Sequence, residues 1–379
     1  MPQSYEIFQR IGKNILQTSH INMGATSAPA NMQAAQWDPK RNGVVVNSIP
    51  IPEPKPNQIL VKMASASLCR SDILAIELPG REEPFTLGHE GAGFVRSIGS
   101  AVPRDKIDFD HGDAVGFLYI NGSCFECAGC MIHNLHCEAD GAQVVVAGFG
   151  GSFGFFAEYA AIDWQNVCLL PSTLDPRASS AIFCAGITAY HAVKSCDLQP
   201  GQTIGIIGAG GLGQLGIQYA KALGLLSVAI DIDDDVLESC IVQGATHTFN
   251  SMTNGDYVSQ LKALTPGNRG LHAAVVFSDA PAAYASTPML LRPGGLWMFI
   301  GLAKNPVGID TTAFTGGAFR IAAESTGIPQ RMKAAVDFTA ENGIVPAVEI
   351  RPGHLHEVDG MVADMRAGKV KGRMGITLD

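Results

Sequence analysis

The chain has 379 residues, of which 46% are hydrophobic and 16% are charged, and this is enough apolar material for two domains with substantial cores. Its 35 acidic and 26 basic residues give a formal net charge of -9 without any lysine or arginine block, which argues against a nucleic-acid partner. No apolar run reaches the ~18 to 20 residues that a membrane span needs, so we expect a soluble protein that binds no membrane.

The N-terminal extension, residues 1–31, lacks the apolar core of a signal peptide and is too poor in arginine for a good organelle presequence. We interpret it as a mobile tail or a short clasp, and we expect a cytoplasmic protein. Thiols stay reduced in that compartment, so the 9 cysteines favour a metal site over disulfides.

Two patterns of elements follow in chain order. Over residues 32–185, β-rich runs such as GVVVNSI, QILVKMASAS and GAGFVRSIG are separated by glycine and proline, which predicts a β-rich, barrel-like domain. Over residues 186–326, strands such as TIGII, SVAID and HAAVVF alternate with helical stretches, which predicts a parallel, doubly wound α/β sheet. Residues 327–379 begin with a helix that ends at Gly343, and we expect the rest to return to the first domain.

A glycine-rich turn, GAGGLG, follows the strand TIGII and opens a helix. In such a turn Gly208 permits the tight bend, Gly210 lets a pyrophosphate approach the backbone, and Gly213 lets helix and strand pack closely. Asp231 ends the next strand 18 residues after Gly213, where a carboxylate would bind an adenine-ribose diol and repel a 2'-phosphate. The pattern predicts NAD rather than NADP. The alternative is a turn that only joins strand to helix.

Cysteine and histidine residues form two candidate metal sets. The first is compact and suits tetrahedral zinc in a closed, structural site; it comprises Cys124, Cys127, Cys130 and Cys137. Its alternative is a loop of four reduced cysteines without metal. The second set is dispersed, and each member alone is as consistent with a packed structural residue; it comprises Cys69, His89, Glu90 and Cys184.

Five segments in chain order resemble the zinc-dependent medium-chain alcohol dehydrogenases, in particular the fungal ethanol-dehydrogenase type: LGHEGAGFV, NGSCFECAGC, FCAGITAYHAVKS, GAGGLGQLGIQYAKALG and KVKGR. The resemblance covers about residue 33 to the C-terminus and implies a GroES-like catalytic domain with a Rossmann domain. It implies catalytic zinc ligands at Cys69, His89 and Cys184, with Glu90 as a nearby acid that can approach the metal transiently. Asp72 matches the carboxylate that orients the histidine ligand.

The resemblance also implies a cofactor site. Arg70 and Arg373, which are otherwise ordinary surface cations, match positions that bind the pyrophosphate, and Thr188 matches a residue that packs against the nicotinamide. The other residues expected at the cofactor are the turn residues Gly208, Gly210, Gly211, Leu212 and Gly213, the ribose-binding Asp231, and the backbone at Ile300, Gly301 and Leu302, which would hold the carboxamide.

The chain departs from the family pattern at two places. Ser71 matches the hydroxyl that carries a proton between the substrate oxygen and the cofactor ribose, but the histidine that continues this relay in many relatives is here Leu74. Six residues separate Cys130 from Cys137 where the family usually has seven, so a thiolate replaced by His133 or His136 stays an alternative.

The segment from Ile73 to Leu87 is shorter than in the ethanol type and lacks its pocket tryptophan, while Tyr119 stands where that type has another tryptophan. The wider pocket favours an alcohol, aldehyde or ketone larger than ethanol. We therefore predict an NAD-dependent enzyme with one catalytic and one structural zinc per chain. We expect a homodimer or homotetramer that can pair through the edge strand FRIAAEST. The alternatives are reduction of a conjugated C=C or an imine, and a non-catalytic NAD-binding protein.

Overall fold

The computed structural model describes residues 31–351 and 354–378, so the predicted extension lies outside the described residues except for Asn31. The chain divides into two compact units. The first runs to Cys184 and also includes Ile328–Val336 and the chain from Val348 onward, and the second comprises Ala185–Gly327 and Asp337–Ala347. Within the described ranges, no helix has the length and hydropathy that crossing a membrane would require.

The first unit is built on a seven-stranded sheet in the order β10-β6-β5-β3-β18-β17, with β9 also paired to β3. Its neighbours are antiparallel, apart from the parallel pair β17 and β18. The bounds are β3 Gln58–Leu68, β5 Glu90–Ile98, β6 Ala114–Phe117, β9 Tyr159–Asp163, β10 Val167–Leu169, β17 Val348–Arg351 and β18 Arg373–Thr377. The remaining strands form two small sheets, with β2 Gly43–Pro50, β1 Asn31–Asp38 and β4 Phe85–Thr86 in one, and β7 Ile120–Asn121 and β8 Val145–Val146 in the other.

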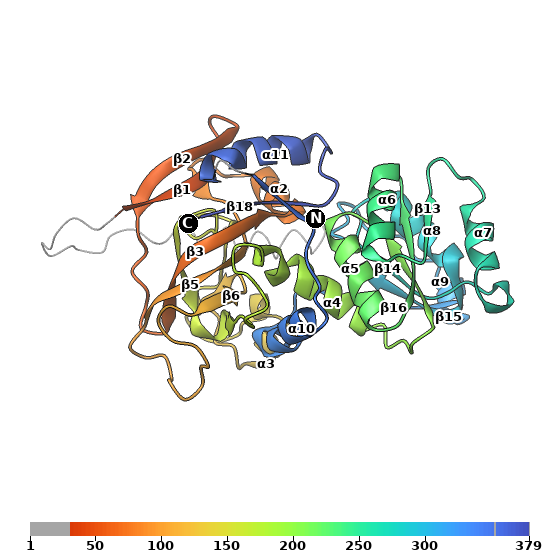
Figure 1. The fold of residues 1–379 in the computed structure, drawn as a ribbon, viewed down its shortest axis with the longest axis horizontal. Helices are drawn as coiled ribbons and strands as arrows, with labels where there is room; N and C mark the ends of the chain where they lie inside the picture. Colours follow the sequence, from red (N-terminus) through yellow and green to blue (C-terminus); the bar gives the residue numbers. More distant parts are fainter. Residues whose placement is uncertain (1–30, 352–353, 379) are drawn as a thin grey trace, which may run out of the picture. The chain divides into compact units, whose positions relative to one another are not determined.

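Short helices connect these strands, and Figure 1 shows α11 beside β2. Their bounds are α2 Arg70–Glu77, α3 Ala128–Ile132, α11 Val358–Arg366, η2 Asn134–His136, η3 Trp164–Asn166, η4 Ser180–Phe183 and η6 His354–Glu357. Helix α10, Pro329–Glu341, begins in the first unit and ends in the second.

The core of the first unit lies around β3, whose residues are buried on both faces except at Leu60 and Lys62. Phe117 of β6 and Phe155 meet edge to face there, with ring centroids 4.9 Å apart. Helix α11 adds Val358, Met361 and Val362 to the same core, and this spacing places all three side chains on one helix face. The run QILVKMASAS therefore corresponds to a strand that is buried on both faces, whereas the run GVVVNSI forms the half-buried strand β2.

The second unit contains a six-stranded, entirely parallel sheet in the order β13-β12-β11-β14-β15-β16, which confirms the predicted α/β class. The strands are β11 Thr203–Ile207, β12 Leu226–Asp231, β13 His247–Asn250, β14 Leu271–Val276, β15 Leu291–Phe299 and β16 Phe319–Ala323. The helices are α4 Ala185–Lys194, α5 Gly211–Ala222, α6 Asp234–Gln243, α7 Tyr257–Ala263, α8 Pro281–Leu290, α9 Thr311–Thr315 and the short η5 Pro266–Asn268.

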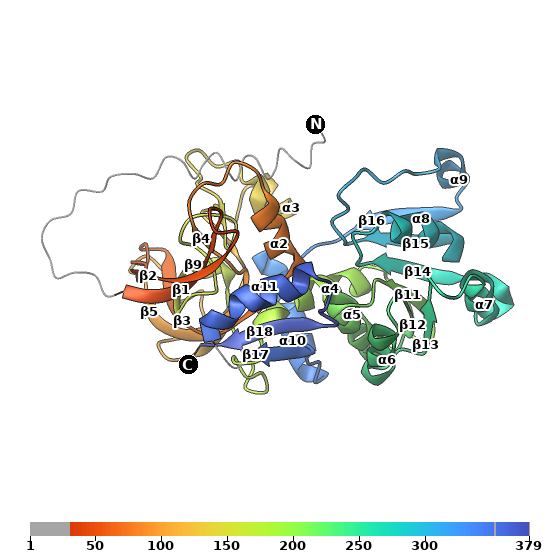
Figure 2. The ribbon, with the colours of Figure 1, turned by 90° about the horizontal axis from the view of Figure 1, so that it is seen from above.

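Helices cover both faces of this parallel sheet. Side chains of α4, α5 and α6 form one apolar layer with the strands, and side chains of α7 and α8 form the other. Figure 2 shows α5 and α6 on one side of the strands and α8 on the opposite side. The strand order reverses between β11 and β14, so the turn after β11 lies where open α/β sheets bind ligands.

The tight contact between Gly116 and Phe183 generates a stability prediction. A Cβ atom on Gly116 would lie 1.8 Å from the Phe183 ring, which is fully buried and directly precedes Cys184. We expect Gly116→Ala to destabilise the first unit by about 2 kcal/mol, because overpacking displaces the ring, and to lower the midpoint of urea unfolding. Gly360→Ala in α11 is the control, since its Cβ would meet nothing within 4 Å. Equal midpoints for the two variants would contradict the packing argument.

Candidate metal and cofactor sites

The dispersed set of possible ligands comes together in the first unit. Cys69 caps the N-terminus of α2, His89 directly precedes β5, and Cys184 follows η4. With Glu90, they each offer one ligand atom, and these atoms all lie within 4.8 Å of one another. Segments far apart in the sequence therefore supply two thiols, an imidazole and a carboxylate to one largely buried point.

The imidazole of His89 is oriented by Asp72. His89 Nδ1 lies 3.0 Å from Asp72 Oδ1, and the same carboxylate accepts backbone hydrogen bonds from Cys69 at 2.8 Å and from Gly88 at 3.2 Å. This contact places the ring proton on Nδ1 and leaves a lone pair on Nε2. His89 Nε2 is buried without a hydrogen-bond partner among the described residues, as expected for an atom that binds a metal.

Glu90 is held away from bulk water by two donors. Its side chain is fully buried, and its carboxylate accepts hydrogen bonds from Arg373 at 2.7 Å and from Ser67 at 2.6 Å. Burial raises the pKa of Glu90, and the Arg373 charge opposes that shift. Arg373 is only 5% exposed, so its description as an otherwise ordinary surface cation is wrong. Its partner lies 283 residues away in the sequence, where no local pattern points to it.

The two thiols of the cluster have opposite protonation tendencies. A hydrogen bond with Cys184 lowers the pKa of Cys69 well below its usual range despite burial, and the Arg373 charge adds to the effect. The same hydrogen bond, followed by burial, raises the pKa of Cys184. The lowered pKa of Cys69 favours its thiolate, which is the form that binds metals.

Four other side chains lie close to this cluster or on the same helix. Ser71, in the first turn of α2, has its hydroxyl oxygen 3.8 Å from Cys69 Sγ. Leu74 is half-buried on the same helix. The ring of Tyr119 meets His89 edge to face with centroids 5.2 Å apart, and Phe149 does the same at 6.1 Å. Phe149 is a contact that sequence reasoning missed, because it lies in a glycine-rich loop without a metal-ligand motif.

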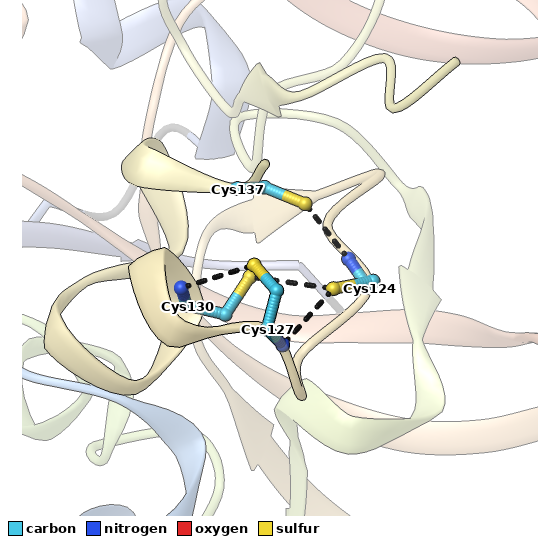
Figure 3. Close-up of side chains that lie close together, drawn as sticks. All are labelled: Cys124, Cys127, Cys130 and Cys137. Carbon is cyan, nitrogen blue, oxygen red and sulfur yellow. Dashed lines mark hydrogen bonds between the residues drawn. The ribbon is translucent and has the colours of Figure 1, made fainter. Parts of the chain in front are cut away.

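The compact cysteine set forms a second cluster around α3 (Figure 3). The sulfurs of Cys124, Cys127, Cys130 and Cys137 all lie within 4.8 Å of one another, and those of Cys124 and Cys130 are 3.8 Å apart. Sulfurs around tetrahedral zinc at ~2.3 Å would be about 3.8 Å apart, whereas a disulfide needs ~2.0 Å. The residues present therefore fit a metal ion.

Backbone N–H groups point at these sulfurs. The sulfur of Cys127 accepts from Cys130 at 3.4 Å and from Glu138 at 3.3 Å. The amides of Cys127 and Cys124 donate to Cys124 Sγ and Cys137 Sγ, each at 3.3 Å. The backbone donors to Cys127 lower the pKa of its thiol and so favour the thiolate, whereas burial raises the pKa of Cys130. Neither His133 nor His136 belongs to the cluster of ligand atoms found in the described residues, so all four positions are taken by cysteine.

A buried acid anchors the start of the cysteine loop. Asp163 is 1% exposed, and its carboxylate accepts hydrogen bonds from the backbone of Gly122 at 2.6 Å and from Gln58 at 2.9 Å. Its own amide donates to Asn121 at 3.0 Å. Burial raises the pKa of Asp163, and these hydrogen bonds oppose the shift. The sequence carries no signal for this anchor, since Asp163 is 41 residues away from Gly122.

The second unit holds the glycine-rich turn between β11 and α5. Gly208 has a φ of +80°, and a Cβ there would lie 2.8 Å from Ser278. A Cβ on Gly213 would lie 2.5 Å from the carbonyl oxygen of Gly208, so only glycine permits this close approach of helix and turn. Gly210 caps α5, and the position of its missing Cβ is open. The turn, which includes Gly211 and Leu212, is therefore closely packed at Gly208 and Gly213 and open at Gly210.

Asp231 ends β12 beside this turn. Its carboxylate accepts hydrogen bonds from the amide of Ala209 at 2.6 Å and from the amide of Ile232 at 2.7 Å. One oxygen thus holds the glycine-rich turn, and the other holds the segment that follows the strand. The carboxylate is fixed at the end of the strand, where the sequence pattern places the ribose contact.

The structure also places the other residues expected at the cofactor. Thr188 of α4 is buried and shares a hydrogen bond of 3.0 Å with Thr326. The amides of Ile300 and Gly301 donate to the carbonyl of Val276 at 3.1 and 2.9 Å, just beyond the end of β15, while the side chain of Leu302 is exposed. Arg70 is exposed at the start of α2 in the first unit.

Comparisons with known proteins agree with this architecture. The family described as "Alcohol dehydrogenase GroES-like domain" matches residues 55–172, and the family described as "Zinc-binding dehydrogenase" matches residues 211–338. The sequence is 33% identical to alcohol dehydrogenase 1 of Emericella nidulans over 356 residues, which covers 90% of this chain and 97% of that protein.

Solved structures show the same fold. An alcohol dehydrogenase of Aeropyrum pernix superposes with a TM-score of 0.78 at 25% identity, covering 91% of this chain and 99% of the other. A cinnamyl alcohol dehydrogenase of Sorghum bicolor gives a TM-score of 0.79 at 22% identity, with coverages of 92% and 98%. An acetophenone reductase of Geotrichum candidum, solved in complex with NAD, gives 0.77 at 21% identity, with coverages of 93% and 98%. With its GroES-like unit and its Rossmann-like parallel sheet, the chain belongs to the medium-chain, zinc-binding alcohol dehydrogenase family of oxidoreductases.

Proposed function

We propose that the chain is an NAD-dependent alcohol dehydrogenase that uses a catalytic zinc to interconvert alcohols with aldehydes or ketones larger than ethanol and acetaldehyde. The observation that carries this proposal is the buried, unpartnered Nε2 of His89 among the thiols of Cys69 and Cys184. A buried nitrogen without a partner is costly unless a ligand meets it. Two sulfurs and one nitrogen with an open fourth position are a known set for catalytic zinc.

The residues of the first unit would hold the metal and move a proton. Cys69, His89 and Cys184 would bind zinc, Glu90 would lie beside it, and Asp72 would keep His89 in the ligating tautomer. When bound, zinc would supply a Lewis acid and NAD would accept or donate the hydride. Ser71 would accept the substrate hydroxyl proton and pass it on, since a hydroxyl both donates and accepts.

Residues of the second unit would bind the dinucleotide. The turn from Gly208 to Gly213 would receive the pyrophosphate, and Asp231 would accept hydrogen bonds from the adenine ribose. We assign Arg70 and Arg373 to the pyrophosphate, Thr188 to the nicotinamide ring, and the backbone from Ile300 to Leu302 to its carboxamide. The acidic run Asp233–Asp235 adds negative charge near Asp231, so a 2'-phosphate would be repelled.

Aromatic rings beside His89 support a substrate larger than ethanol. The rings of Tyr119 and Phe149 both make edge-to-face contacts with the imidazole, so the surroundings of the metal cluster are aromatic on at least one side. A small alkyl group would leave much of such surroundings uncovered, whereas a larger or aromatic group would bury them.

The outer strand β16 offers a surface for assembly of the protein. Strand β16 is one of the two outer strands of the parallel sheet, and no strand of the described residues pairs with its outer edge; Phe314 nearby is 42% exposed. We propose that two copies pair at this edge in a homodimer or homotetramer, and that the protein acts in the cytoplasm on small molecules.

The metal assignment predicts the zinc content of cysteine variants. We expect about two zinc ions per chain in the wild type, and NADH oxidation with at least one member of an aldehyde and ketone panel. Cys184→Ser should keep about one zinc and lose this activity, and Cys137→Ser should also keep about one. Cys168→Ser is the control, because this buried cysteine belongs to neither cluster. Full zinc content in Cys184→Ser, measured by atomic emission, would overturn the assignment.

The cofactor assignment predicts a preference for NADH over NADPH. Asp231→Asn should reduce the ratio of kcat/KM for NADH to that for NADPH by about tenfold, because one charge that repels the 2'-phosphate is lost. Asp256→Asn, on an exposed loop of the same unit, should leave the ratio unchanged. Steady-state kinetics with both cofactors measures the ratio. A wild type that prefers NADPH would refute the role of Asp231.

The leucine in the proton relay predicts an altered pH profile in one variant. Leu74→His should raise turnover near neutral pH by at least about twofold and add an ionisation near the usual histidine pKa, since the imidazole would continue the relay from Ser71. Leu74→Gln supplies polarity without a titrating group and should not add the ionisation. If kcat and its pH dependence are the same in all three proteins, proton transfer does not run along α2.

A further inference from the structure

Asn250, the last residue of β13, uses the full hydrogen-bonding capacity of its side-chain amide. Its nitrogen donates to the carboxylate of Asp234 at 2.7 Å and to the carbonyl of Ile232 at 3.2 Å. Its oxygen accepts from the amides of Met252 at 2.9 Å and Thr253 at 3.1 Å. A side-chain amide has two N–H donors and two lone pairs, so nothing is left over for solvent or a ligand.

These contacts join two segments that flank the predicted ribose-binding carboxylate. In the parallel register of β12 and β13, Asn250 is paired with Asp231 itself. Ser251, the next residue, donates its amide to the carbonyl of Asp231 at 2.9 Å. The turn from Asp231 to Asp234 is therefore held from the side of β13 at its first, second and last residues.

The turn needs such a brace because it is crowded with like charges. Asp231 binds the amides of Ala209 and Ile232, and Asp233 caps α6 by accepting from Asp235 and Val236. Asp234 has no such backbone partner, and within residues 31–351 and 354–378 its carboxylate hydrogen-bonds only to Asn250. A neutral donor at this point fixes the third carboxylate without adding a cation.

We propose that Asn250 is a positioning residue for the adenosine half of the dinucleotide. It contacts no cofactor itself. It holds the Ile232–Asp234 segment so that Asp231 and the 58% exposed side chain of Ile232 are already in place when the nucleotide arrives. The inference rests on the proposed function, since it assumes that the turn receives adenosine. It goes beyond that function by naming what makes the turn rigid.

The variant Asn250→Asp tests this selectively. Aspartate has the same shape and still accepts from Met252 and Thr253, but it cannot donate to Asp234 or Ile232 and places a second carboxylate against Asp234. Asn254→Asp is the matched control, because it adds the same charge in the same loop and breaks only the exposed hydrogen bond to Gln260. Asn250→Ala removes the contacts without adding charge, in case the aspartate variant folds poorly.

Calorimetric titration with ADP-ribose, which is the dinucleotide without its nicotinamide and therefore keeps the adenosine, measures binding without any turnover. We expect Asn250→Asp to raise the Kd for ADP-ribose by about tenfold and Asn250→Ala by about threefold, with Asn254→Asp unchanged. An unchanged Kd in both Asn250 variants, with native circular dichroism, would overturn the proposal.

Turnover with a truncated cofactor separates positioning from general damage. With NADH, Asn250→Asp should raise KM by about tenfold and leave kcat within about twofold. With the reduced mononucleotide NMNH, which lacks the adenosine half, kcat/KM should equal that of the wild type. An equal loss with both cofactors would refute the role. If the wild type binds ADP-ribose but reduces no carbonyl, the proposed dehydrogenase function fails, while the calorimetric comparison still decides the role of Asn250.

Discussion

The carboxylate of Asp72 is the contact on which the geometry of the larger metal cluster depends. It is fully buried and binds three groups at once: the amide of Cys69, the amide of Gly88 and the Nδ1 of His89. The Asp72 carboxylate thus fixes the N-terminus of α2, the loop before β5 and the imidazole relative to one another. Each buried donor that lost this acceptor would lower the stability of the fold by about 1 to 3 kcal/mol. Asp72 therefore couples the positions of the three groups.

The cysteine cluster is also positioned by a buried carboxylate, in this case that of Asp163. Here Asp163 holds Gly122, two residues before the first sulfur, against the large sheet, while backbone amides hold the sulfurs themselves. In both clusters the ligands lie at or near loops, and a buried carboxylate ties each loop to regular structure. The arrangement explains why loops with many glycines can present ligand atoms within 4.8 Å of one another.

The sequence predicted the features that depend on local spacing and left out those that depend on distant partners. The glycine turn, the strand end at Asp231 and the four clustered cysteines follow from short-range patterns, because a turn or a four-ligand loop needs its residues close together. The burial of Arg373 did not follow, since its partner Glu90 is 283 residues away. Phe149, Asp163 and Asn250 were missed for a related reason: each acts through a neighbour that only the fold supplies. The dispersed zinc ligands Cys69, His89 and Cys184 were predicted only from the resemblance to a family, because their spacing in the sequence does not indicate that they come together.

The position of Arg373 in β18 has a consequence for the order in which the protein can form. Strand β18 is the last of the described strands, and it lies between β3 and β17 in the large sheet. A nascent chain that emerges from the ribosome can form the parallel sheet of the second unit first, because all of its strands precede β17. The first unit, although it begins earlier in the sequence, lacks one neighbour of β3 and the Arg373 partner of Glu90 until β18 has been synthesised. Loss of β18 would therefore damage the unit whose other strands are synthesised first.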